Sequence, residues 1–564
     1  MKNFKLVTFL VLLNLLFIQT LKATEYTVYS IAELKATITN SAANDIINLA
    51  DGTYLNTTLT ISKNRITVKA LNLGGVFLNG TNDITISGNY VTFSGFQFTS
   101  GDIGSNYLLK ISGSYNKIMH LNFSNYYAKK YIEIQAGSQY NEISYCNLEK
   151  KPADAVIGCT IQISTSPTVP GYHKISYCSF QNYYGVGGDN GNEPIRIGLG
   201  AESQNISRTI VEHCYFNNTG LGDSESISIK CQENVVRNCT FTNQQNAMLC
   251  FRNGDNNVAY SNFFINAGGI RVKEANNIYC YNNYFENSGT TSGSNNADAV
   301  TYVYYTANTT NVLNNINFIH NTFYNCSNID LGGIGATNNT WANNIFQKNS
   351  GDIFSNQNSG TTWVGNIYKG TLGINIPTGI NSSDPFLALN SDVYYGLSSS
   401  SPINNANSGC PTILDIANID DDPNLLFDIS GQARPSTVTL KDVGCDEYTS
   451  GTTTNHPLTL SEVGPSYLVT LTTGIIDVTT TKTIVFPNPV KNNLTIQFPN
   501  TINGDTEVTI ITVNGQVIKK QLISQNEVID YQKQIDVTDL KNGIYLLQLH
   551  STNYSKVLKI VIQK

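Results

Sequence analysis

Residues that could carry out acid–base chemistry gather between Asp223 and Asp255. Asp223 and Glu225 are one residue apart, and in an extended strand such residues point to the same face. Lys230 follows closely, and Arg252 lies 22 positions further on. Because one turn of a coiled sheet takes about 20–25 residues, we expect Lys230 and Arg252 to stack one turn apart. Two carboxylates able to hold a metal ion, a lysine and an arginine would then share one groove, which suits chemistry on a polyanionic sugar.

A recurring phrase indicates the element that positions these residues. Each copy alternates apolar and polar residues, as a β-strand does, and most copies end in Phe. The final residues of successive copies are Phe123, Leu148, Phe180, Phe216, Phe241, Phe264, Phe285, Phe323 and Phe346. The shortest spacings are 21 to 25 residues, and the longer ones indicate inserted loops. A strand that repeats at this period predicts a parallel β-helix.

The position two residues before the end of each phrase predicts the core. It is Cys in four consecutive copies and then Asn in four, at Cys146, Cys178, Cys214, Cys239, Asn262, Asn283, Asn321 and Asn344. Equivalent positions stack in such a coil, so we expect a buried cysteine stack that continues into a ladder of hydrogen-bonded asparagines. The 11 cysteines are therefore interpreted mainly as core residues rather than as a disulfide framework or metal ligands. An amphipathic helix near Ile31–Asn40 is expected to cover the first turn.

The two ends of the chain predict export and a second domain. Residues 1–23 have Lys2 and Lys5 before a mostly apolar run, which predicts a secretory signal peptide, with a membrane anchor as the alternative. We expect a β-helix domain over 24–448, a Thr/Ser/Gly-rich linker over 449–482 and a small β-sandwich over 483–564. The fold class is thus all-β. A net charge of −7 disfavours nucleic acid as a partner.

The C-terminal β-sandwich resembles the sorting domains of the type IX secretion system. The FPNP entry, the Asn-Gly-Gln turn and the strand containing Gly-Ile-Tyr carry this likeness. The resemblance implies interaction with that secretion machinery, export across the outer membrane to the cell surface or the medium, and removal of the tail. A carbohydrate-binding module is the alternative interpretation.

The middle of the chain resembles polysaccharide lyase family 6, which contains alginate lyases and chondroitinase B. The likeness rests on DNGNEPIRIG at 189–198, the acid-x-acid-xxxx-Lys segment at 223–230, QEN at 232–234 and FR-x-GD at 251–255. The repeated strand phrase extends it to most of 24–448. The resemblance implies a right-handed parallel β-helix and cleavage of a uronate polymer by β-elimination, with the polysaccharide as partner.

The resemblance also implies a role for each site residue. Asn190, Asp223 and Glu225 would bind Ca²⁺, which neutralises the substrate carboxylate and makes the C5 proton easier to remove. Lys230 would be the general base, its deprotonation favoured by nearby positive charge. Arg252 would lie near the leaving oxygen and assist its protonation mainly through hydrogen bonding.

Arg196 would bind a substrate carboxylate. Two positions depart from the family pattern. Asp223 stands where the family usually has Glu, and Asn253 stands where it usually has His after the arginine. The second departure puts a histidine role in substrate protonation in doubt.

Alginate is the substrate that the sequence favours. Residues 287–346 contain no Arg or Lys that could bind sulfate, whereas alginate carries only carboxylates. The alternatives are a dermatan sulfate lyase, a uronate C5-epimerase, a glycoside hydrolase and a non-catalytic surface adhesin. The aspartate and Gly-His-Gly motifs of β-helix hydrolases and the Asp-Pro-His-Asp motif usual in epimerases are missing. The oligomeric state and the preference for mannuronate or guluronate stay open.

Overall fold

The structure is a computed structural model in which two compact units are distinguished, residues 1–470 and 471–564. It describes residues 23–152, 158–185, 191–244, 246–289, 297–303, 313–332, 335–402, 412–416, 422–449, 451–468, 484–497, 505–512, 516–524, 532–551 and 554–564. The predicted signal peptide, apart from Ala23, lies outside these residues, as does Asn190.

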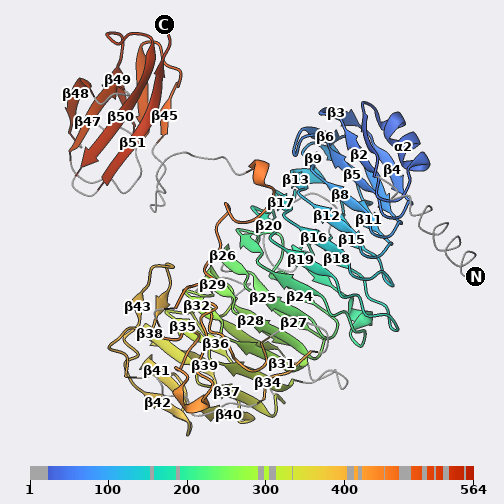
Figure 1. Ribbon diagram of the computed structural model, residues 1–564. Coiled ribbons are helices and arrows are strands. Elements are labelled where there is room, and N and C mark those ends of the chain that lie inside the picture. Colours follow the sequence, from blue (N-terminus) through green and yellow to red (C-terminus); the bar gives the residue numbers. More distant parts are fainter. Residues whose placement is uncertain are drawn as a thin grey trace, which may run out of the picture. The chain divides into compact units, whose positions relative to one another are not determined.

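The first unit is a parallel β-helix, as the repeat predicted (Figure 1). Its strands form three long parallel sheets, which we call A, B and C. Sheet A runs over 14 strands from β1 (Glu25–Val28) to β40 (Thr361–Val364), and sheet B over 14 from β3 (Gly52–Leu55) to β42 (Ile380–Ser382). Each strand pairs with the equivalent strand of the next turn, so side chains at equivalent positions stack along the axis.

Sheet C has 12 strands and carries the candidate site. In chain order they are β4 (Thr58–Ile61), β7 (Asp83–Ile86), β11 (Tyr107–Ile111), β15 (Lys130–Ile134), β18 (Ile161–Ile163), β21 (Ile195–Ile197), β24 (Glu225–Ile229), β27 (Met248–Arg252), β30 (Ile270–Lys273), β33 (Val300–Val303), β36 (Ile329–Asp330) and β39 (Phe354–Asn356). Most inward positions in the first strands hold Ile or Leu, and the outward positions are largely polar, because only one face of the sheet meets the core.

The helix α2 (Ile31–Asn40) covers the first turn, as predicted. The side chain of Ser30 caps it by accepting a hydrogen bond from the amide of Glu33 at 3.1 Å. The Glu33 carboxylate in turn accepts one from the amide of Tyr29, the residue before the cap, at 2.8 Å. Leu34 and Ile38, four residues apart on one face, are the buried residues of the helix.

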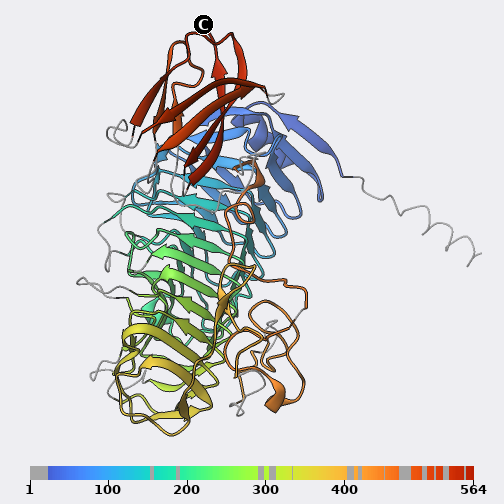
Figure 2. The same cartoon turned by 90° about the vertical axis from the view of Figure 1, so that its left-hand side faces the viewer.

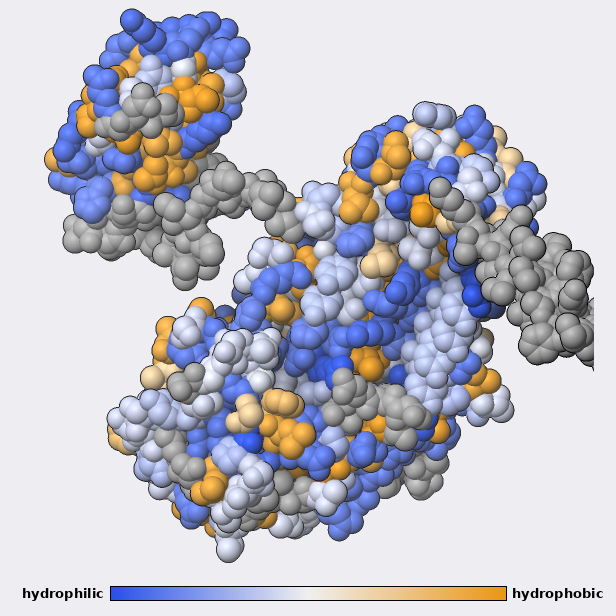
Figure 3. Space-filling view, viewed as in Figure 1, coloured by the Kyte–Doolittle hydropathy of each residue, from blue (hydrophilic) through white to orange (hydrophobic). Residues whose placement is uncertain are grey.

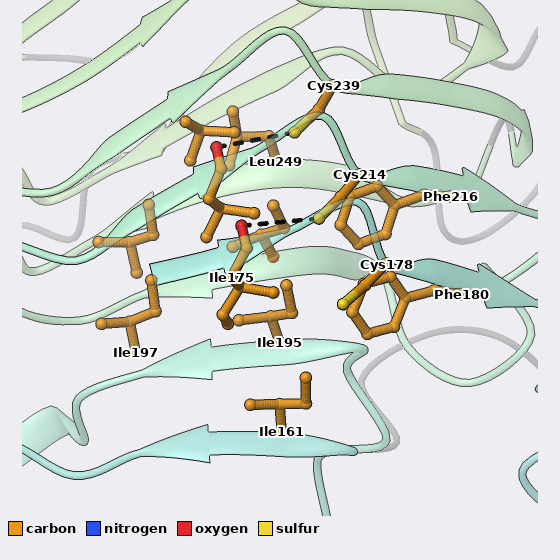
Figure 4. Close-up of a cluster of buried hydrophobic side chains, with 14 of the residues drawn as sticks. Ile161, Ile175, Cys178, Phe180, Ile195, Ile197, Cys214, Phe216, Cys239 and Leu249 are labelled. Atoms are coloured by element: carbon orange, nitrogen blue, oxygen red, sulfur yellow. Dashed lines mark hydrogen bonds between the residues drawn. The ribbon is translucent and has the colours of Figure 1, made fainter. Parts of the chain in front are cut away.

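The cysteine stack and the asparagine ladder are both confirmed. Cys146, Cys178, Cys214 and Cys239 are fully buried, and the thiols of the last two donate to carbonyls of the preceding turn (Figure 4). In the ladder each amide Nδ2 donates to the Oδ1 of the next turn at 3.0 Å, from Asn262 to Asn283, on to Asn321 and on to Asn344. Ten cysteines of the described residues are buried and free of disulfides.

The C-terminal part of the first unit packs on sheets A and B. Ile413, Ile416 and Leu425 cover sheet A next to Tyr279. Tyr394 and Ile429 cover sheet B next to Phe263. Figure 2 shows this segment, in orange, beside the turns of the β-helix. Residues 451–468, at the start of the predicted linker, also lie against the β-helix. The amide of Gly464 donates to the Tyr177 carbonyl at 2.7 Å.

The second unit is a small antiparallel β domain. One sheet contains β45 (Ile484–Phe486), β46 (Asn493–Gln497) and β49 (Gln532–Asp536). The other contains β47 (Thr506–Thr512), β48 (Val517–Ile523), β50 (Gly543–Ser551) and β51 (Tyr554–Ile562). A separate cluster of buried Val, Ile and Leu side chains forms its core.

Candidate active site

Three buried carboxylates meet at the start of the middle strands of sheet C. Glu193, Asp223 and Glu225 each offer an oxygen, and these oxygens lie within 4.8 Å of one another. Glu225 begins β24, and Glu193 lies two residues before β21. The pairing of Ile195 with Ile227 brings Glu193 one turn away from Glu225 on the same face. We call these three residues the acid cluster.

Asp223 is held in place by the backbone. Its Oδ2 accepts a hydrogen bond from the amide of Gly191 at 2.5 Å, and its Oδ1 accepts one from the amide of Glu225 at 2.9 Å. Burial raises the pKa of Asp223 to about 7, and the negative charge of Glu193 adds to this effect. A raised pKa means that the Asp223 carboxyl holds a proton more readily than an exposed aspartate does. A cation bound at the acid cluster would compete with that proton.

Two arginines border the acid cluster. Nε of Arg196 donates to Oε1 of Glu193 at 3.0 Å, and its Nη2 donates to the other oxygen of Glu193 and to the Gly191 carbonyl. Nη1 of Arg252 donates to Oε1 of Glu225 at 3.1 Å. The Arg252 side chain keeps 33% of its surface exposed, whereas that of Glu225 keeps 2%. Arg252 thus joins the buried cluster to the surface of the β-helix.

Lys230 and Arg252 lie one turn apart, as their spacing predicted. Ile229 pairs with Phe251, so the two residues that follow them occupy neighbouring turns. The backbone amide of Lys230 donates to the Ile197 carbonyl at 2.7 Å. Its half-buried side chain has no hydrogen-bond or ion-pair partner within the described part of the chain. The amine is therefore available to a bound molecule. Figure 3 shows hydrophilic residues predominating over the middle turns of the β-helix on the side turned toward the viewer.

Asn253, at the position where the resemblance implies histidine, takes part in a different contact. Its Nδ2 donates to the buried carboxylate of Glu274 at 3.0 Å. Asn253 has φ of 64°, a left-handed conformation that asparagine tolerates well. Asn253 therefore forms the turn after β27 and bonds to the next turn of the β-helix.

The acid cluster fits a hard divalent cation. Carboxylate oxygens are the donors that Ca²⁺ prefers. Oε2 of Glu225 is buried without a hydrogen-bond partner among the described residues, and an unpaired buried carboxylate oxygen is costly unless a cation or donor meets it. Three carboxylates so close together also repel one another, which a cation would relieve.

The structure brings Asp223, Glu225, Arg196 and Arg252 together, as the sequence predicted. It adds Glu193, which the sequence interpretation did not include. A signal was present, because Glu193 precedes Ile195 by the same two residues that separate Glu225 from Ile227. The long loops between these turns hid that register. The predicted ligand Asn190 lies outside the described residues.

Comparison with known proteins identifies the family. The model of the family described as chondroitinase B matches residues 28–369, which is more than half of the chain. The chain belongs to the chondroitinase B family. It is a polysaccharide lyase family 6 member, in agreement with the resemblance seen in its sequence. No curated protein matches it.

Solved structures support the β-helix fold of this family member. The family 6 alginate lyase AlyGC is 20% identical with a TM-score of 0.59, and the match covers 67% of this chain and 56% of that one. A mannuronic acid specific family 6 lyase from human gut microbiota is 22% identical with a TM-score of 0.55, covering 64% and 91%. A family 6 polysaccharide lyase from Pseudopedobacter saltans is 18% identical with a TM-score of 0.51, covering 78% and 99%. The chain thus spans little more than half the length of AlyGC.

The second unit matches a secretion system C-terminal sorting domain over residues 484–563. This family 6 member is therefore exported, to the cell surface or the medium. Among the described residues there is no helix of the length and apolarity that crossing a membrane requires.

Proposed function

We propose that the protein is a secreted lyase that cleaves a uronate polymer, with alginate as the favoured substrate, by cation-assisted β-elimination. The observation that supports this most is the unpaired Lys230 amine one turn from Arg252, whose guanidinium bonds to Glu225 of the acid cluster. Removing a proton next to a carboxylate requires a base, a positively charged group that stabilises negative charge, and a cation that neutralises the carboxylate. Lys230, Arg252 and the acid cluster could supply these three functions.

The proposed reaction is an elimination that breaks the link between two sugars and consumes no second substrate. The Lys230 amine takes the proton from C5, and the electron pair left behind forms the C4=C5 double bond. The bond between C4 and the bridging oxygen then breaks, and that oxygen takes up a proton from solvent to become the hydroxyl of the released chain. Lys230 returns the C5 proton to solvent and is ready for the next cycle. Arg252, half-exposed and always charged, hydrogen-bonds the leaving oxygen as negative charge develops on it.

We further propose that Asp223, Glu225 and Glu193 hold Ca²⁺, with Asn190 as a further ligand. When bound, the cation neutralises the substrate carboxylate and so makes the C5 proton more acidic. Arg196 binds a substrate carboxylate through its planar guanidinium. By holding the cation, the carboxylates of this chain therefore place its positive charge where the reaction develops negative charge.

Alginate is favoured over dermatan sulfate because residues 287–346, which follow the site along the chain, carry no Arg or Lys. The family description points toward chondroitin-type substrates, whereas the family 6 structures named above as alginate or mannuronate lyases point toward alginate. We therefore favour a polymer that carries carboxylates without sulfate.

For the whole chain we propose a signal peptide over 1–23, a lyase domain over 24–448, a linker over 449–482 and a sorting domain over 483–564, with tail removal after export. Residues 451–468 lie against the β-helix, so a shortened lyase intended for assay should retain them.

The test is ultraviolet absorbance of the unsaturated uronate end after incubation with alginate, dermatan sulfate and polygalacturonate. We expect a rise on alginate that Lys230→Ala abolishes and EDTA suppresses. Lys174→Ala is the matched control, because Lys174 pairs with Glu212 on sheet A, away from the site. A rise on dermatan sulfate alone would reverse the substrate choice. No rise on any polymer would refute the lyase proposal, and a changed mannuronate content without cleavage would indicate epimerisation.

A further inference from the structure

Both arginines of the site are bound to carboxylates that the cation would also need. Arg196 contacts both oxygens of Glu193. Arg252 contacts Oε1 of Glu225, while Oε2 of the same carboxylate has no partner among the described residues. The acid cluster therefore already has two positive neighbours before any metal ion arrives.

These contacts oppose the roles proposed for the arginines. An arginine in a two-point ion pair with Glu193 presents fewer N–H donors to a substrate carboxylate. The Glu193 and Glu225 side chains are nearly inaccessible, at 4% and 2% of their surface exposed. Removing the arginine alone would leave a buried carboxylate uncompensated, which is strongly unfavourable. Each arginine can leave only if another cation takes its place.

We propose that a divalent cation in the acid cluster competes with Arg196 and Arg252 for Glu193 and Glu225, and thereby releases both guanidinium groups toward the substrate. This inference rests on the proposed cation site. Glu193 and Glu225 act as positioning residues, since each holds an arginine when the cation is absent and the cation when it is present.

The proposal makes cation and substrate binding reciprocal. If the cation frees arginines that then bind the uronate chain, the chain must tighten cation binding by the same factor. The competition also lowers the cation affinity of the free protein, because a positive charge roughly 6 Å from a divalent ion opposes its binding. At the high effective dielectric of a partly exposed site, this corresponds to about tenfold in Kd per arginine.

Isothermal titration of the full chain with Ca²⁺ tests the competition without relying on turnover. We compare the wild type with Arg196→Gln, Arg252→Gln and Arg196→Lys. Arg237→Gln is the matched control, because Arg237 makes a similar two-nitrogen ion pair with the buried Glu212 on another sheet.

We expect each Gln variant of the site to bind Ca²⁺ about tenfold more tightly than the wild type, with Arg196→Lys closer to the wild type and Arg237→Gln unchanged. Far-UV circular dichroism confirms that the variants are folded. Weaker or unchanged Ca²⁺ binding in both Gln variants would overturn the competition, because it would mean that the arginines support the site. If neither the wild type nor the Gln variants bind Ca²⁺, the cation site itself fails together with this inference, while the lyase proposal is judged by its own assay.

A second titration tests the release. In Lys230→Ala protein, an uncleaved oligomer of the polymer that the wild type degrades should bind more tightly with Ca²⁺ than with EDTA. The ratio should shrink when Arg196→Gln is added to that background. An equal ratio in both backgrounds would show that Arg196 is not released, even if Ca²⁺ binds.

Discussion

His173 should make the β-helix sensitive to mild acid. It lies at a position that recurs in each turn of the β-helix and that the preceding turns fill with asparagine. Oδ1 of Asn116 accepts a hydrogen bond from the Val91 amide, and Oδ1 of Asn141 accepts one from the Asn116 amide. In the next turn Nδ1 of His173 accepts one from the Asn141 amide at 3.2 Å. Burial lowers the pKa of His173 from 6.5 to about 3. The imidazole must be neutral to accept this bond, so the folded state resists its protonation.

The sign and size follow from linkage. Because the pKa is lowered in the folded state, the stability is complete above pH 6.5 and is lost as the pH falls toward 3. At about pH 5 the unfolded histidine is protonated and the folded one is not, which costs about 2 kcal/mol. This value depends little on the folded pKa, provided that it lies well below 5.

The substitution His173→Asn removes the titration and keeps an acceptor of the type used in the neighbouring turns. Urea unfolding followed by tryptophan fluorescence reports the β-helix alone, because both tryptophans, Trp341 and Trp363, lie in sheet A. Between pH 8 and pH 5 the wild type should lose about 2 kcal/mol more than His173→Asn. The exposed His550, changed to Asn in the sorting domain, is the control. Equal losses in wild type and His173→Asn would refute the reasoning.

Three further outcomes are expected. Asn321→Ala should cost about 2–4 kcal/mol in the same unfolding assay, since it breaks two rungs of the buried ladder and removes a donor to the Cys280 carbonyl. Asn349→Ala, on the exposed surface of β38 (Ile345–Asp352), should cost under about 0.5 kcal/mol. Similar losses in the two variants would contradict the buried ladder. Ser30→Ala should cost about 1 kcal/mol by removing the cap of α2, measured as a lower urea midpoint, and no change would mean that the cap is dispensable. Ca²⁺ should raise Tm more at pH 8 than at pH 5.5, because burial raises the pKa of Asp223 to about 7 and a ligand must lose its proton; an equal rise at both pH values would exclude Asp223 as a ligand.

The repeat of the strand phrase was enough to predict the architecture. Alternation of apolar and polar residues at a fixed period reports which side chains face the core, and this is a property of consecutive residues. For the same reason the cysteine stack, the asparagine ladder, the helix Ile31–Asn40 and the one-turn separation of Lys230 and Arg252 could be read from spacing alone. The sorting domain could be predicted from its strand and turn motifs.

The tertiary structure decided which charges meet. Glu193 and Glu225 are 32 residues apart, and loops of unequal length between successive turns conceal that they share one face. The ion pairs of Arg196 with Glu193 and of Arg252 with Glu225 depend on side-chain positions across separate strands. The packing of Ile413, Tyr394 and Leu458 on sheets A and B depends on such positions as well. Sequence period determines register within a coil, but contacts between side chains of different turns depend on how the inserted loops close, which only the folded chain determines.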